Sequence, residues 1–232
     1  MRAPLALLLL AALASCETLP AQGRSEFFEE IRRDRGPARL ARGETVSQGL
    51  FGMAFLDRAH LDARPFGTTA APRSDPLQVP FVGGAFQHVL WGEDVDLGLE
   101  IGATVGARND LAYVADPGGA ATPVDVDLVT CDLFGGPFVS LPLSDGVRVY
   151  GAAGPSIQFV EWDQRDALGV QNETGLAAGL YARAGFEFRL SSALLLGVGI
   201  RRIDTTVPLG GGLGDLELEG NQVFVTLSMV TY

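Results

Sequence analysis

The sequence predicts an all-β protein, an eight-stranded antiparallel up-and-down transmembrane β-barrel. Three observations support this: apolar and polar residues alternate over long segments, long and short connections alternate, and residues 17–232 contain no apolar run long enough for a spanning helix. Strict alternation has the period of a β-strand, whose successive side chains point to opposite faces. The longest segments exceed the about 5–6 residues of a typical strand and reach the roughly 9–11 residues needed to cross a bilayer at a tilt.

The clearest alternation lies in residues 176–201. Every second residue before the polar pair Ser191-Ser192 is apolar, and charged side chains occupy several of the positions between them. The pattern resumes after this pair and continues to Arg201. Two such runs joined by so short a connection predict an antiparallel hairpin.

Eight strands are predicted in all, at residues 45–57, 79–91, 95–108, 124–141, 147–162, 176–190, 194–201 and 222–232. In the second strand, the adjacent polar residues Gln87 and His88 place one polar side chain on the apolar row unless a bulge intervenes. The fourth strand is expected to be bulged or to end near Gly135-Gly136-Pro137. The third strand has the cleanest division into one apolar and one polar face.

The connections between these strands alternate in length. Four long segments rich in Gly, Pro and polar residues are predicted as loops at residues 57–78, 109–123, 163–174 and 205–220. Three short turns are predicted at residues 92–94, 142–146 and 191–192. Transmembrane barrels have short periplasmic turns and longer extracellular loops, and an even strand number puts both termini on the periplasmic side. The alternation therefore favours a membrane barrel over a soluble sandwich.

The composition narrows the range of partners. The chain has 232 residues, which fits a single β-domain. All 17 basic residues are arginine, against 28 acidic residues, and the net charge is −11. Nucleic acid is not an expected partner because phosphate binding needs a basic surface. The 30 glycines are typical of strongly curved sheets.

Residues 1–15 are predicted to be a signal peptide, with Arg2 followed by an apolar stretch. This stretch ends in Leu13-Ala14-Ser15-Cys16, which resembles the lipobox of bacterial lipoproteins and implies cleavage before Cys16 and lipidation of that cysteine. Ordinary cleavage nearby, with loss of Cys16, is the alternative. Residues 16–44 are predicted to be a polar tether between lipid and barrel, or else a short partner-docking helix. The barrel domain is predicted to cover residues 45–232.

Two segments resemble a known family. Residues 184–191 followed by residues 194–201 resemble the penultimate hairpin of small bacterial outer-membrane β-barrel proteins of the OmpA-like and OmpW-like type, and residues 143–159 resemble their central hairpin. The resemblance covers residues 45–232. It implies an outer-membrane location, with membrane lipids as partners and a small solute or surface ligand reached through the extracellular loops. The chain departs from the family pattern near Tyr232, because the preceding apolar row lies on the opposite parity.

Charged residues fall on the predicted inner faces of the strands. They are Glu100, Arg108, Arg148, Arg183, Glu187, Arg189 and Arg201. The lumen of an eight-stranded barrel is just wide enough to be filled by side chains, and an unpaired buried ion is costly. These residues are therefore expected to pair as an internal charge network. A narrow gated pore or a ligand site lined by the same groups is the alternative.

No catalytic site, cofactor or metal is expected from the sequence. Some small barrels are enzymes that act on lipid A through His with Ser and an acid, but here only His60 and His88 are available, and neither has such a neighbour. Asp116, Asp125 and Asp127 offer oxygen ligands for calcium, with a solvated acidic rim as the alternative. Histidine and cysteine lack the spacing of metal ligands.

The sequence thus predicts a non-enzymatic outer-membrane barrel with an envelope-structural, surface-interaction or small-solute passage role. The alternative is a soluble periplasmic lipoprotein with a lipocalin-like barrel that binds an apolar ligand. The two differ in which row of side chains faces the lumen. Trp91, Trp162 and Tyr232 are predicted to lie at the membrane interfaces, where aromatic residues gather.

Overall fold

Nine antiparallel strands form one sheet in the computed structural model, which describes residues 40, 42–63, 68–72, 77–92, 94–115, 121–144, 146–166, 169–191, 193–210 and 214–231. The strands are β1 (Thr45–Ala63), β2 (Thr68–Pro72), β3 (Leu77–Gly92), β4 (Asp96–Ala115), β5 (Ala121–Ser144), β6 (Val147–Asp166), β7 (Gly169–Arg189), β8 (Leu194–Leu209) and β9 (Gly214–Thr231).

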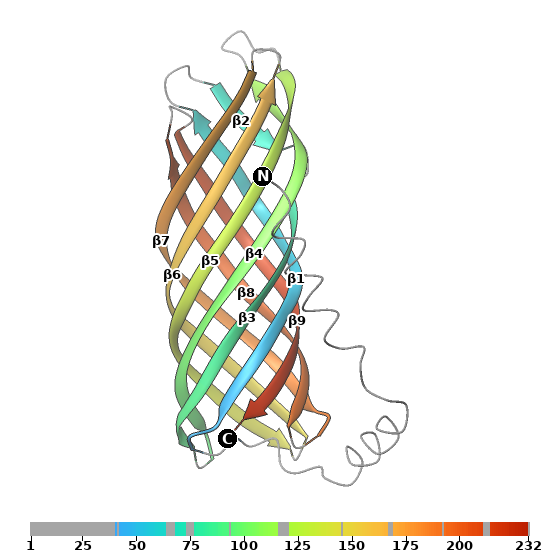
Figure 1. The fold of residues 1–232 in the computed structure, drawn as a ribbon, viewed down its shortest axis with the longest axis vertical. Helices are drawn as coiled ribbons and strands as arrows, with labels where there is room; N and C mark the ends of the chain where they lie inside the picture. The colour runs from blue at the N-terminus through green and yellow to red at the C-terminus, as the bar shows by residue number, and fades with distance from the viewer. Residues whose placement is uncertain are drawn as a thin grey trace.

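Eight of the nine strands close a ring, which confirms the predicted fold class. The order is β1-β3-β4-β5-β6-β7-β8-β9, and β9 pairs with β1. The short β2 pairs with β1 and β4 at the end of the barrel opposite the C-terminus (Figure 1). We call this the loop end, and we call the other end, with the connections after β3, β5 and β7, the turn end. None of the described residues forms a helix that is long and apolar enough to cross a membrane.

The predicted long loops are wrong, because the strands extend far into them. β1 continues to Ala63, β4 to Ala115, β6 to Asp166 and β8 to Leu209. The alternation of side chains persists there, but the apolar residues now face inward and the polar residues outward. On β8 beyond Arg201, apolar Ile203 and Val207 are buried, whereas polar Asp204 and Thr206 are exposed. Outward-facing polar residues give a strand the composition of a loop, which is why the sequence predicts loops here.

The barrel therefore has two tiers. At mid-height, large apolar side chains are exposed on the outer wall and many of the buried side chains are polar, whereas apolar Val46, Val89 and Leu195 are buried at the turn end. Towards the loop end most buried side chains are apolar, although Gln164 and Thr205 are buried there too. The apolar ones include Leu56, Leu77, Val126, Leu128, Val160, Trp162, Val207, Leu216 and Leu218. This part of the barrel near the loop end, which we call the second tier, has an apolar interior and a polar exterior, as in an ordinary soluble barrel.

Two predicted irregularities are resolved by the structure. Gln87 is buried in the lumen, whereas His88 faces outward and its Nδ1 lies 3.0 Å from Thr45 Oγ1. The bulge in β3 falls between Val89 and Trp91, past both of these residues. The fourth predicted strand does not end near Gly135, because β5 is continuous from Ala121 to Ser144.

At this point β5 and β6 approach each other unusually closely. Their pairing stops at Phe134↔Ser156 and resumes at Phe138↔Ala152. A Cβ atom added at Gly136 would lie 2.2 Å from the Ala153 carbonyl oxygen, and one added at Gly154 would lie 2.2 Å from the Gly135 oxygen. Only glycine fits such a contact between two backbones.

The pairing of β7 with β8 is also interrupted. Among the described residues, it stops at Gly175↔Leu209 and resumes at Ala182↔Arg202. Residues 176–181 and 203–208 keep their partners on β6 and β9 but have no ladder partner across this junction. Pro208, which has no backbone N–H, lies in the interrupted segment of β8. We call this junction the β7–β8 seam.

The structure also describes the last residues of the predicted tether. Leu40 is 1% exposed, and its backbone N–H lies 3.4 Å from Asp96 Oδ2. Gly43 N–H donates to the Val89 carbonyl, and Val89 N–H donates to the Glu44 carbonyl, both at 2.9 Å. The chain thus packs against the turn end of the barrel before β1 begins. The rest of the predicted tether, the signal peptide and Cys16 lie outside the described residues.

Candidate functional site

The lumen contains a buried ion pair between β4 and β7. Arg183 Nη2 lies 2.5 Å from Glu100 Oε2, and Arg183 Nε donates to the same oxygen at 3.0 Å. Both side chains are fully buried. Inward alternation on the two strands places these residues across the lumen from each other.

A second buried pair joins β6 and β7. Arg148 Nε donates to Glu187 Oε2 at 2.6 Å, and Arg148 Nη2 contacts the same oxygen. Both side chains are fully buried. Ser228 and Thr226 of β9 donate their hydroxyls to Glu187 Oε1 at 2.6 Å and 3.3 Å.

Two glutamines connect these pairs to each other. Gln48 of β1 donates its Nε2 to Glu187 Oε1 at 2.8 Å, and its Oε1 accepts from Arg183 Nη2. Gln87 of β3 donates to Glu100 Oε2 at 2.7 Å and accepts from Arg148 Nη2 at 3.3 Å. The contacts close a ring of six side chains, which we call the lumen ring: Gln48, Gln87, Glu100, Arg148, Arg183 and Glu187.

Aromatic side chains pack around the lumen ring. The Arg183 guanidinium carbon lies 5.2 Å from the centroid of the Tyr150 ring and 5.7 Å from that of Phe134. Tyr181 donates its hydroxyl to Glu100 Oε1 at 3.2 Å. Buried ions need both a counter-ion and further hydrogen bonds to offset desolvation, and the lumen ring supplies both.

A third pair lies beside the lumen ring. Arg201 of β8 contacts Asp132 of β5, and its guanidinium carbon lies 4.4 Å from the centroid of the Phe134 ring. Sequence reasoning missed Asp132, together with Gln48 and Gln87. All three share the inward parity of charged residues on their own or neighbouring strands, and this parity is the signal that identifies them.

Of the seven charged residues predicted for the lumen, four join the lumen ring and Arg201 joins the third pair. The remaining two lie apart. Arg108 lies in the second half of β4 and Arg189 at the turn end of β7, and both side chains are half-buried.

The three predicted interface aromatics differ from one another. Trp91, at the turn end of β3, is 68% exposed on the outer wall. Trp162 is fully buried in the lumen, so its predicted interfacial position is wrong. It lies on the inward row, with its indole among apolar residues of the second tier. Tyr232 lies outside the described residues.

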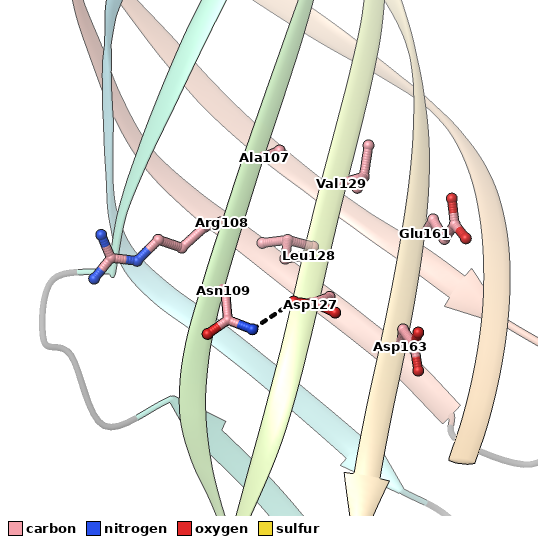
Figure 2. Close-up of a pocket in the computed structure, with 8 residues that line it drawn as sticks. All are labelled: Ala107, Arg108, Asn109, Asp127, Leu128, Val129, Glu161 and Asp163. Atoms are coloured by element: carbon pink, nitrogen blue, oxygen red, sulfur yellow. Dashed lines mark hydrogen bonds between the residues drawn. The ribbon is translucent and has the colours of Figure 1, made fainter. Parts of the chain in front are cut away.

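A hollow of about 560 Å³ lies across β4, β5 and β6, with acidic side chains along it. Figure 2 shows that Arg108 points away from the carboxylates of Asp127, Glu161 and Asp163. Asp127 is already engaged, because Asn109 Nδ2 donates to it at 2.6 Å and Arg165 Nη2 lies 3.3 Å from it. Within the described part of the chain, no group of three His, Cys, Asp or Glu side chains is arranged to hold a metal ion. Asp116 lies outside this part.

Asp132, Gln158 and Gln222 line a small cavity beside the lumen ring, with room for about one water. At the height of the lumen ring the lumen is occupied by side chains, as expected for eight strands.

Comparison with known proteins supports this architecture. The outer membrane protein OprG from Pseudomonas aeruginosa matches with a TM-score of 0.51 and 14% identity, over 86% of this chain and 99% of that chain. Ail, the attachment invasion locus protein of Yersinia pestis, matches with a TM-score of 0.48 and 13% identity, over 82% and 100% of the two chains. No protein-family model matches the chain, and no curated protein matches it in sequence. The likeness to OprG shows the fold alone.

Proposed function

We propose that this chain is a bacterial outer-membrane β-barrel with a closed lumen, which acts through its outer wall and its loop end. The lumen ring carries this proposal, because it joins five strands across the centre of the barrel, which supports a closed lumen. A role in envelope structure or surface interaction follows, in preference to small-solute passage.

The outer wall supports the membrane location. Large apolar side chains are exposed on all eight strands of the ring, and Leu180 reaches 76% exposure. A continuous apolar band is the lipid-facing surface of a transmembrane barrel, in which it is about 25 Å tall. In aqueous solution, an exposed apolar surface of this size would cause the protein to aggregate.

The alternative of a soluble carrier fits the lumen less well. A lipocalin-like barrel needs an apolar chamber, whereas here the middle of the lumen holds two buried arginine–glutamate pairs. The second tier does have an apolar interior, but its side chains pack together into a core.

The proposal includes the absence of catalysis. Among the described histidine side chains, that of His88 faces the outer wall and contacts a threonine hydroxyl. The buried glutamates of the lumen ring are held by arginines, so neither is available as a general base. Lipidation at Cys16 remains part of the proposal on the evidence of the lipobox, and mass spectrometry of the mature N-terminus tests it.

Membrane fractionation and conductance test the main proposal. We expect the chain to need detergent for extraction, to migrate faster in unheated than in heated detergent gels, and to give no steady conductance in planar bilayers. Extraction without detergent would contradict the membrane location. Stable single channels from the unaltered protein would contradict the closed lumen.

A further inference from the structure

The outer wall has a polar step on β8 and β9. On β8 the outward row is apolar from Leu194 to Ile200 and then becomes polar, and on β9 the apolar outward row ends at Val223. We define the polar step by the outward residues Arg202, Asp204, Thr206, Glu219 and Asn221. Arg202 and Glu219 form an ion pair with side chains that are 42% and 32% exposed.

Apolar strands flank the step on both sides. Arg202 pairs with Ala182 on β7, where the outward row continues through exposed Leu180 and Leu176. Asn221 pairs with Phe55 on β1.

The apolar row of β8 covers about 7 residues, or about 23 Å of strand. At the usual tilt this spans about 18 Å, short of the about 25 Å band of a transmembrane barrel.

The step adjoins the β7–β8 seam. Residues 203–208 of β8, which lack ladder partners on β7, include Asp204 and Thr206 of the step. Unpaired backbone groups are not tolerated against hydrocarbon, because lipid tails offer no hydrogen bonds. They are tolerated where water or polar groups reach them. The two features thus explain each other: the seam needs polar surroundings, and the step supplies them.

We propose that the polar step draws water and lipid headgroups down the outer wall to the β7–β8 seam, thinning the surrounding membrane on this side of the barrel only. A short apolar stretch is known to be accommodated by local thinning. Headgroups fit the step better than a second copy of the chain. Arg202 already pairs with Glu219, so two copies meeting here would place Asp204 and Glu219 against like charges.

Cysteine accessibility in phosphatidylcholine vesicles tests this inference, which rests on the proposed membrane location. In a Cys131→Ser background, Thr206→Cys lies on the step, and Leu133→Cys lies on the outer wall of β5, three strands from β8. Neither substitution changes Arg202 or Glu219. We expect a membrane-impermeant thiol reagent to label Thr206→Cys about tenfold faster than Leu133→Cys, because hydrocarbon excludes the reagent from the latter. Equal rates would overturn the inference.

Further variants separate the ways in which the test can fail. Leu196→Cys, well inside the apolar band of β8, should be the slowest, and rapid labelling there would contradict the membrane location itself. Oxidative cross-linking of Thr206→Cys into dimers, with slow labelling, would mean that a second copy covers the step, and this outcome overturns the headgroup assignment. Adding Arg202→Leu and Glu219→Leu should slow the labelling of Thr206→Cys severalfold. Unchanged heat-dependent gel migration shows that each variant is folded.

Discussion

Gln48 and Gln87 have matching roles on opposite arcs of the lumen ring. Each donates to the glutamate of one ion pair and accepts from the arginine of the other. A glutamine does this well because its side chain is both donor and acceptor and carries no charge. The two ion pairs therefore become one network that spans the lumen.

Gln48→Leu should destabilise the barrel. The change removes one hydrogen bond from Glu187 and one from Arg183, both of which stay buried and charged. Loss of a partner for a buried polar group costs about 1–3 kcal/mol. Unfolding by urea in lipid vesicles measures the change. Gln78→Leu, at an exposed site on β3, is the matched control and should change stability by less than about 0.5 kcal/mol.

Arg183→Ala should lower the free energy of unfolding by more than the removal of an exposed charge does. It leaves the Glu100 carboxylate buried without its arginine, and breaking a buried pair in this way costs about 3–5 kcal/mol. The exposed pair gives the control, because Arg202→Ala should cost about 0–1 kcal/mol. If the two variants unfold at the same denaturant concentration, Arg183 is not holding a buried charge.

Combining Arg183→Met with Glu100→Gln should recover part of the stability lost in Arg183→Met alone. With both charges removed, no uncompensated ion remains in the lumen, and an uncompensated buried ion is the costly part of a broken pair. The same urea titration measures the recovery. A double variant as unstable as Arg183→Met would indicate that shape, not charge balance, determines the packing here.

Gly154→Ala should disrupt the contact of β5 with β6. The added methyl group would lie 2.2 Å from the Gly135 carbonyl oxygen, so the strands must separate. Overpacking of this kind costs about 1–3 kcal/mol or more. Gly146→Ala is the control, because a Cβ there meets nothing within 4 Å. The fraction of heat-modifiable protein after refolding compares the two, and equal yields would refute the close approach.

The chain's two tryptophans should respond differently to brominated lipids. Trp91 lies on the outer wall and Trp162 is buried in the lumen. Brominated acyl chains should therefore quench the emission of the Trp162→Phe variant, which retains Trp91, much more strongly than that of Trp91→Phe. Strong quenching of Trp91→Phe would place Trp162 against lipid and contradict its position inside the barrel.

The strand pattern could be predicted wherever the apolar row faces outward. Residues 95–108 and 176–201 show this, because in each segment one parity is almost entirely apolar and the other holds the charged residues. Prediction failed where the two sides exchange. Beyond Arg201, apolar Ile203 and Val207 continue the inward parity, but the polar residues between them resemble a loop. The sequence does not show at which residue a strand leaves the lipid bilayer. That position decides whether the outer or the inner face of the strand must be apolar.

The candidate site was predictable as a set of charges but not as a network. Inward parity identifies Arg148, Arg183 and Glu187 without structure. Which acid contacts which arginine depends on the stagger of strands around the ring, and alternation along single strands does not determine that stagger. The role of Gln48 lay beyond reach for the same reason, since its partners are 135 and 139 residues away.

These sequence separations bear on how the barrel assembles. The lumen ring takes side chains from β1 and from β7, so its contacts form only when almost the whole sheet is present and curled. A half-inserted sheet would expose Glu187 and Arg183 to lipid without their glutamine, at a considerable cost. Partial insertion is thereby penalised, and entry into the membrane is coupled to closure as one cooperative event.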